Sequence, residues 1–99
     1  MSSSDRLYEL LAKIPRGKVT TYKELAKAVG KPRASRAIGQ ILNKNPKPVV
    51  IPCHRVVKSN GDVGGYAYGS RKKVELLENE GVKISRGKIL DFDEVSFRF

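Results

Sequence analysis

Two short amphipathic segments, joined by a tight turn, constrain the fold of this chain more than any other feature. In the first segment, Thr21 and Glu24 have the spacing of a helix capping box. The apolar residues that follow are Leu25, Ala26, Ala28 and Val29. Gly30 then predicts a left-handed helix cap. In the second segment, which runs to about Asn43, apolar residues recur with helical period: Ala34, Ala37, Ile38, Ile41 and Leu42. Two short helices joined in this way predict a helix-turn-helix unit.

The flanking sequence predicts two more helices and several short strands. One helix is expected over about Asp5–Ile14, and another from a Ser70 cap to Asn79 or Glu80. Short strands are expected at Val49–Ile51, Arg55–Val57, Val82–Ile84 and Lys88–Leu90. The alternation of three apolar residues predicts an edge strand at the end of the chain, at Val95, Phe97 and Phe99. The predicted fold class is therefore mostly α with short β elements.

The length of 99 residues predicts one domain over residues 1–99, with residues 1–4 disordered. No run of about 18 apolar residues occurs, so no membrane span is expected. The polar start of the chain does not have the pattern of a secretory signal. A single cysteine fits a reducing compartment and argues against a structural zinc site. We therefore expect an intracellular monomer without a metal, in the cytoplasm of a prokaryote or the nucleus of a eukaryote.

The charge balance indicates a polyanionic partner. The chain has 20 basic and 10 acidic residues, a net charge of +10. Such an excess on a small domain favours nucleic acid first and an anionic membrane surface second. A basic surface that only confers solubility is the plain alternative. Polar residues of the second amphipathic segment lie off its apolar stripe and can face DNA: Arg33, Ser35, Arg36, Gln40, Asn43 and Lys44.

The only cysteine, Cys53, stands beside the only histidine, His54. A thiol attacks as its thiolate, and an ordinary cysteine has a pKa of about 8.5, so it needs a neighbouring base or positive charge to react at neutral pH. His54 and Arg55 supply such groups. Spacing alone leaves two interpretations open, an activated nucleophile or a small buried thiol next to a surface histidine.

Several motifs together resemble one family. Pro52 to Val56 has the sequence Pro-Cys-His-Arg-Val, and it is preceded by Arg36-Ala37-Ile38-Gly39 and Asn45-Pro46. With Tyr22, Gly65-Tyr66 and Glu80-Gly81, the chain is similar to the O6-alkylguanine-DNA alkyltransferases over about residues 14–81. The resemblance implies a winged helix-turn-helix-like domain whose second helix enters the minor groove of double-stranded DNA. It also implies base flipping and direct, irreversible transfer of an alkyl group from O6-alkylguanine, or O4-alkylthymine, to the cysteine.

The resemblance also implies the role of each site residue. Cys53 is the acceptor, His54 a base that acts through a water, and Glu80 the residue that orients His54. Tyr22 donates a hydrogen bond or proton to guanine N3, and Arg36 enters the duplex in place of the flipped base. Asn45 joins the recognition helix to the cysteine segment. The pocket for the base is expected at Pro52, Val56, Gly65 and Tyr66, and no cofactor is required.

Two other functions stay open. Short alkyltransferase-like proteins bind alkylated DNA without repairing it and usually have tryptophan at the cysteine position, whereas this chain has Cys53 and no tryptophan. A basic transcription factor with an incidental cysteine would bind a specific DNA sequence regardless of alkylation. Many family members also carry an additional amino-terminal domain, sometimes with zinc, and that domain is not part of the matching residues.

Overall fold

The computed structural model describes residues 3–44, 51–66 and 68–99. Its elements, in chain order, are α1 (Ser3–Leu11), β1 (Thr20–Thr21), α2 (Tyr22–Ala28), α3 (Ser35–Leu42), the 3-10 helix η1 (Cys53–Arg55), β2 (Val56–Val57), α4 (Ser70–Asn79), β3 (Ile84–Ser85), β4 (Lys88–Ile89) and α5 (Phe92–Val95). The prediction of a mostly α fold with short β elements is confirmed. None of the helices in these ranges has the length and apolar character to cross a bilayer.

The helix pair α2–α3 forms where the sequence predicts it. The Thr21 hydroxyl accepts a hydrogen bond of 3.0 Å from the Glu24 amide at the start of α2. The Glu24 carboxylate lies 3.8 Å from Lys27 Nζ instead of completing a capping box. At the other end Gly30 has a φ of +76°, and the Gly30 and Lys31 amides donate to the carbonyls of residues 27 and 26. This is the Schellman pattern that a left-handed glycine permits.

The strand pair β1–β2 connects the two halves of the chain. The two strands are parallel, with Thr20 opposite Val56 and Thr21 opposite Val57. Successive side chains of a strand point to opposite faces. Val56 accordingly joins one hydrophobic cluster and Val57 the other. The pairing therefore places the segment after η1 directly beside the start of α2.

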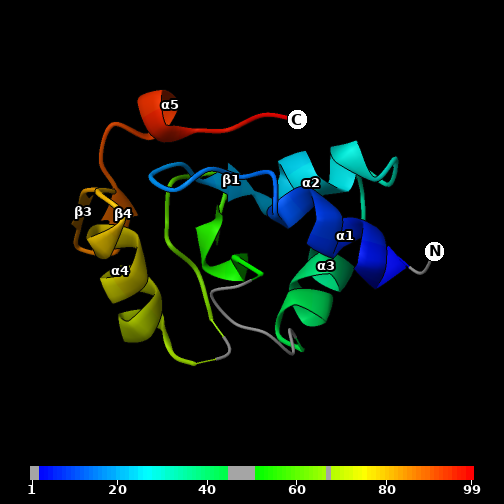
Figure 1. Ribbon diagram of the computed structural model, residues 1–99, viewed down its shortest axis with the longest axis horizontal. Helices are drawn as coiled ribbons and strands as arrows, with labels where there is room; N and C mark the ends of the chain where they lie inside the picture. Colours follow the sequence, from blue (N-terminus) through cyan, green and yellow to red (C-terminus); the bar gives the residue numbers. More distant parts are fainter. Residues whose placement is uncertain (1–2, 45–50, 67) are drawn as a thin grey trace.

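Two hydrophobic clusters lie on either side of this strand pair. The first cluster joins α1, α2, α3 and η1, and its buried members are Leu7, Leu10, Leu11, Ile14, Leu25, Ala26, Ile38, Leu42, Cys53 and Val56. The second joins α4 to the β3–β4 hairpin through Val19, Val57, Val63, Leu77, Val82 and Ile89. In Figure 1, α1–α3 accordingly occupy one end of the molecule, and α4 with β3 and β4 the other.

The two predicted helices that flank the central pair form with shifted ends. Helix α1 begins at Ser3 and ends at Leu11 instead of Ile14. Ile14 remains buried because hydrogen-bonded turns continue to it from Leu11. Ser70 is not the cap of α4. Gly69, with a φ of +94°, holds that position without a side-chain hydrogen bond.

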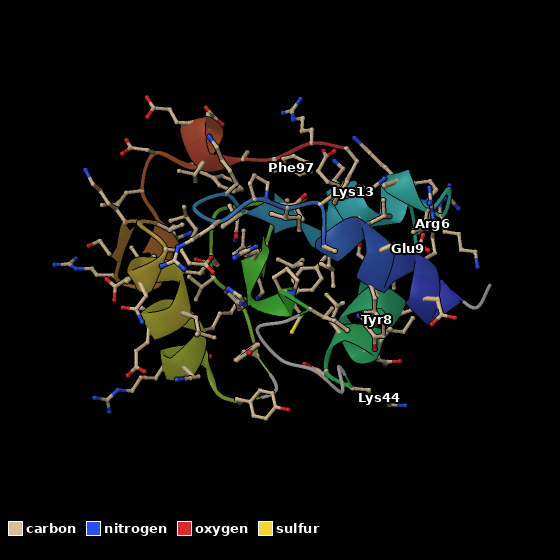
Figure 2. All side chains as sticks on the ribbon, in the orientation of Figure 1. Arg6, Tyr8, Glu9, Lys13, Lys44 and Phe97 are labelled. Atoms are coloured by element: carbon tan, nitrogen blue, oxygen red, sulfur yellow. The ribbon has the colours of Figure 1, made fainter. Side chains whose placement is uncertain are left out.

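The end of the chain differs from the predicted edge strand. Residues 92–95 form the short helix α5, because the amides of Glu94 and Val95 donate locally to the Asp91 carbonyl. Ser96 makes a single parallel bridge to Val19. Phe97, labelled in Figure 2, then packs against the first cluster.

The two segments beside the cysteine turn were also predicted as strands. Arg55 belongs to η1, so the second of these strands is only Val56–Val57. In the predicted strand Val49–Ile51, residues 49 and 50 lie outside the described residues. The predicted pairing of the segments around residues 85–87 is confirmed by the antiparallel β3–β4 hairpin.

Two neighbouring threonines provide a test of the cap of α2. Thr21→Val removes the cap and should lower the free energy of unfolding by about 1 kcal/mol. Thr20 is also buried, but its hydroxyl has no hydrogen-bond partner among the described residues. Thr20→Val should therefore leave stability unchanged or increase it. Urea denaturation of both variants measures the difference, and equal losses would contradict the assignment of the cap.

Candidate active site

The cysteine lies in a tight turn that packs into the first hydrophobic cluster. Pro52 has φ −81° and ψ 62°, and the Cys53 amide donates to the Ile51 carbonyl at 2.8 Å. These values define an inverse γ-turn, whose φ suits proline. The Arg55 amide then donates to the Pro52 carbonyl at 3.0 Å, which closes η1. Cys53 is 5% exposed, so the fold buries most of this residue.

His54, Arg55 and Glu80 form one buried hydrogen-bonded group. Glu80 Oε2 lies 3.0 Å from His54 Nε2 and 2.6 Å from Arg55 Nη2, and Glu80 Oε1 accepts from Arg55 Nε at 2.9 Å. An ionised carboxylate only accepts hydrogen bonds, so His54 Nε2 carries the proton. His54 Nδ1 is then the unprotonated nitrogen. It is buried and has no partner among the described residues.

The end of α4 brings Glu80 to the cysteine turn. Glu80 is the C-cap residue of α4, and the segment after α1 crosses this helix end. The Arg16 side chain donates to the Asn79 carbonyl at 2.9 Å, and Arg55 Nη1 donates to the Ile14 carbonyl at 2.8 Å. A Cβ at Gly17, which has a φ of +87°, would lie 3.2 Å from the Glu80 carbonyl. Three segments distant in sequence therefore fix the position of this carboxylate.

The electrostatics of this group keep the histidine neutral and the carboxylate charged. Burial lowers the pKa of His54 below its usual value, and the cations Arg55 and Lys73 add to this effect while Glu80 opposes it. Burial raises the pKa of Glu80, but the hydrogen bonds from Arg55 and His54 outweigh it, so the net pKa is lowered. At neutral pH the residue that follows the cysteine in sequence thus has an unprotonated imidazole nitrogen.

Lys73 of α4 is fully buried beside the cysteine segment. Its ammonium donates to the Val56 carbonyl at 2.6 Å and the Gly65 carbonyl at 3.1 Å, and it lies 5.9 Å from the centre of the Tyr22 ring. Burial, with a smaller contribution from Lys58, lowers the pKa of Lys73 to about 8, although the charge of Cys53 opposes this. Lys73 therefore joins the loop before α4 to the strand after the cysteine.

Two tyrosines adjoin the same region. Burial, and then the charge of Cys53, raises the pKa of Tyr22 above its usual value. The same causes, together with Tyr68, raise the pKa of Tyr66 to about 12. The rings of Tyr66 and Tyr68 meet edge to face at a centroid distance of 5.5 Å. Both Tyr22 and Tyr66 are therefore protonated hydrogen-bond donors at neutral pH.

An open pocket of about 350 Å³ lies between α3 and the loop that follows β2. It is lined by Tyr22, Ser35, Arg36, Gly39, Asn43, Lys58 and Gly65. Tyr22 and Gly65 connect it to the cysteine region, since the first interacts with the charge of Cys53 and the second accepts from Lys73. The lining includes five of the residues that the sequence selected, Tyr22, Ser35, Arg36, Asn43 and Gly65.

The other residues predicted for DNA contacts or for the base pocket either do not line this pocket or lie outside the described residues. Arg33 and Gln40 are exposed and do not line the pocket. Pro52 is buried in the cysteine turn, and the Val56 side chain is buried in the first hydrophobic cluster. Asn45 lies outside the described residues.

Ala37 differs from its place in the predicted apolar stripe of α3. It is exposed, whereas Ile38 and Leu42 are buried and Ile41 packs partly against the first cluster. The buried stripe of α3 is therefore narrower than the sequence pattern indicates. The exposed face of the helix presents a small side chain at this position.

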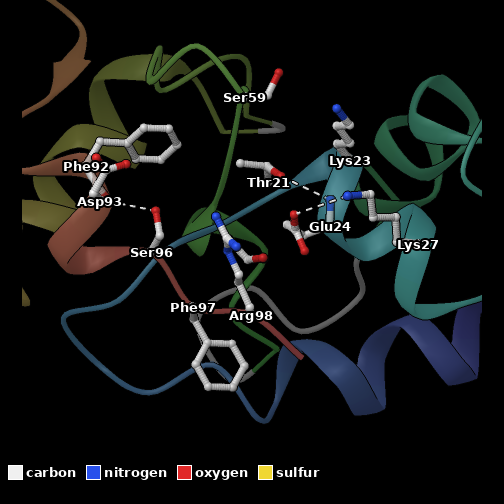
Figure 3. A pocket seen from close by; sticks show the side chains of 11 residues that line it. Thr21, Lys23, Glu24, Lys27, Ser59, Phe92, Asp93, Ser96, Phe97 and Arg98 are labelled. Atoms are coloured by element: carbon white, nitrogen blue, oxygen red, sulfur yellow. Dashed lines mark hydrogen bonds and ion pairs between the residues drawn. The ribbon is translucent and has the colours of Figure 1, made fainter.

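A second pocket, also of about 350 Å³, lies away from the cysteine. Figure 3 shows it between Lys23, Glu24 and Lys27 of α2 on one side and Phe92 and Asp93 on the other. No residue predicted for the site lines it. Across residues 3–44, 51–66 and 68–99, no group of three or more histidine, cysteine, aspartate or glutamate side chains is placed to hold a metal ion.

Comparison with known proteins identifies the family. Residues 2–82 match the family model described as 6-O-methylguanine DNA methyltransferase, DNA binding domain. The methylated-DNA–protein-cysteine methyltransferase of Saccharolobus solfataricus is 50% identical over 78 residues, which cover 79% of this chain and 50% of that protein. The chain belongs to this family, and the resemblance inferred from its motifs is confirmed.

Solved structures agree in fold. Mycobacterium tuberculosis OGT in complex with DNA superposes with a TM-score of 0.78 and 38% identity, covering 81% of this chain and 50% of that one. S. pombe Atl1, in complex with damaged DNA containing O6-carboxymethylguanine, superposes with a TM-score of 0.84 and 33% identity, covering 97% of this chain and 94% of that one. The chain spans 28–50% of the length of the curated relatives it matches.

Two residues of the site had little signal in the sequence. Lys73 stands in the basic run of residues 71–73, which resembles an exposed helix face. One feature of the sequence did indicate that Lys73 is buried. It lies four residues before the apolar Leu77, and residues with this spacing share a helix face. Arg55 stands beside His54 in the sequence, but no local pattern indicates that it binds Glu80 and the Ile14 carbonyl.

The contact between Glu80 and His54 predicts a change in the pH dependence of cysteine alkylation. Glu80→Gln removes the negative charge that stabilises protonated His54, so alkylation of Cys53 should be slower near neutral pH and recover at higher pH. The matched control is Glu78→Gln, which changes an exposed carboxylate of the same helix. Alkylation rates measured across a pH series test this. Identical profiles for both variants would show that Glu80 does not assist His54 in taking the proton of Cys53.

The buried Lys73 predicts a stability that rises in alkali. Its pKa of about 8 in the folded chain lies below the usual lysine value of 10.5, so the unfolded chain binds more protons between these values. Relative to Lys73→Met, the wild-type chain should gain up to about 3 kcal/mol of unfolding free energy across this window. Urea denaturation at several pH values, with Lys72→Met as the exposed control, measures the gain. The same pH dependence in the wild-type chain and the Lys73→Met variant would contradict the lowered pKa.

Proposed function

We propose that this domain repairs DNA by moving an alkyl group from guanine O6 to the Cys53 sulfur in one irreversible turnover. The observation that carries the proposal is the cysteine itself, which stands next to a neutral histidine oriented by a buried carboxylate. The family membership and the methyltransferase relatives support the same activity.

Double-stranded DNA is the proposed partner. The net charge of +10 favours a polyanion. Arg36 and Ser35 of α3 line the pocket that also includes Tyr22, so a helix placed in the minor groove would hold the pocket against the duplex. A base in a duplex keeps O6 out of reach of a buried sulfur, and the damaged nucleotide therefore flips into the pocket. Arg36 would fill the space that the base leaves, and Asn45 would tie the recognition helix to the cysteine segment.

The residues of the site supply each step of the transfer. His54 Nδ1 takes the proton of Cys53 through a water, and Glu80 stabilises the imidazolium that forms. The thiolate attacks the alkyl carbon, the bond between that carbon and O6 breaks, and its electron pair remains on guanine. The protonated Tyr22 hydroxyl donates to guanine N3 and offsets this charge. The product is a thioether, so each protein acts once.

The mass of the protein provides the test. After stoichiometric exposure to a duplex with one O6-methylguanine, the intact mass should rise by one methylene, located on the peptide that contains Cys53. The Cys53→Ala variant and an undamaged duplex are the controls and should show no increase. An unmodified Cys53 at the end of the reaction would falsify the proposed transfer.

A second function is favoured by one observation. The structure of S. pombe Atl1 in complex with damaged DNA is similar to 97% of this chain, with a TM-score of 0.84. A domain that only binds lesions would retain damaged DNA tightly while its mass stays constant. We favour transfer because the thiol is present with its histidine and carboxylate. Binding that ignores alkylation would instead indicate a general DNA-binding protein.

A further inference from the structure

The pocket beside the cysteine has an unbalanced charge. Its two charged lining residues are Arg36 and Lys58, and none of its lining residues among those described is acidic. Arg36 belongs to the helix that carries the proposed DNA contacts. Lys58 comes from the opposite wall, in the loop directly after β2, and the proposed transfer does not use it.

The backbone fixes the position of Lys58. The Lys58 amide donates to the Asp62 carbonyl at 2.9 Å, and the Lys58 carbonyl accepts from the Gly61 amide at 3.0 Å. Its side chain extends over Gly64, where an added Cβ would lie 3.4 Å from Lys58 Cγ and 3.8 Å from Cε. The glycine, which has a φ of +74°, leaves room for this stem. The stem of this exposed side chain therefore packs on Gly64, and Lys58 lines the pocket.

The surroundings leave the charge of Lys58 available. No described carboxylate forms an ion pair with it, and the nearby Asp62 lies 3.0 Å from Lys88 Nζ instead. Lys73 Nζ approaches the same point above Gly64, at 3.9 Å from the added Cβ. Its lowered pKa includes a contribution from Lys58, which places the two amines within electrostatic range. Two basic side chains therefore meet at Gly64, directly before the pocket residue Gly65.

We propose that Lys58 makes this pocket prefer O6 adducts that carry a negative charge, such as a carboxyalkyl group. An adduct carboxylate would otherwise be repelled by the approaching thiolate. Lys58, fixed at the pocket wall, offsets this repulsion and pairs with the carboxylate. This inference rests on the proposed function and specifies the substrate of the same site.

The reaction on such an adduct is balanced without another reactant. The Cys53 thiolate attacks the methylene carbon of an O6-carboxymethyl group, and the bond from that carbon to O6 breaks with its electrons going to guanine. Guanine gains one proton, which equals the proton that Cys53 gives to His54. The products are intact guanine and an S-carboxymethyl thioether.

Three matched duplexes test the proposal, with O6-carboxymethylguanine, its uncharged amide analogue O6-carbamoylmethylguanine, or O6-methylguanine. The quantity measured is the ratio of single-turnover rates for the acid and the amide, which have nearly the same shape. In Lys58→Gln this ratio should fall about fivefold, the upper range for a partly exposed ion pair. Lys58→Arg should retain most of the wild-type ratio. Lys83→Gln, an exposed lysine of the distant hairpin region, should retain all of it.

The outcomes separate this proposal from the proposed transfer. If Lys58→Gln slows all three lesions equally, Lys58 contacts the DNA backbone and the preference is refuted. An unchanged ratio refutes it as well. If no thioether forms on any duplex, the transfer fails. In that case the affinities for the acid and amide duplexes are compared, and the preference of the wild-type chain for the acid should fall about fivefold in Lys58→Gln. When transfer does occur, the same affinities are measured in the Cys53→Ala background.

Discussion

The buried carboxylate of Glu80 holds this site together. It binds the guanidinium of Arg55 through both oxygens and His54 through one, and Arg55 reaches on to the carbonyl of Ile14. The ends of α1 and α4 and the cysteine turn therefore meet at a single group. Breaking a buried pair by removing one partner typically costs about 3–5 kcal/mol, since the remaining charge is uncompensated. The same contact sets the tautomer of His54, so the stability and the chemistry of the site depend on one arrangement.

Much of the fold could be predicted because its signals are local. The capping threonine Thr21, the left-handed Gly30 and the helical period of α3 each specify their element without distant contacts. The predictions are wrong where tertiary contacts or backbone geometry determine the secondary structure. The alternation at the chain end resembles a strand, but the Asp91 carbonyl accepts locally and starts α5. Ser70 has the chemistry of a cap, yet the positive φ of Gly69 starts α4 one residue earlier.

The residues of the candidate site likewise differ in whether local sequence could predict them. Cys53 and His54 are adjacent in sequence and rare in the chain, so the sequence alone could select them. Glu80 was reached only through the family resemblance, because its contact spans 26 residues and depends on where α4 ends. Lys58 and Lys73 were not selected at all, since lysines in polar runs look like solvated surface. Only the packing around Gly64 shows that the Lys58 stem and the Lys73 amine meet beside the pocket.

The tautomer of His54 is the most direct measure of the central claim. The chain has one histidine, so heteronuclear NMR of the imidazole nitrogens gives signals from this residue alone. At neutral pH, a proton on Nε2 and an unprotonated Nδ1 are expected, with the neutral form persisting below the usual histidine pKa because burial lowers it. A proton on Nδ1, or an imidazolium at neutral pH, would contradict the role assigned to Glu80 and leave Cys53 without its base.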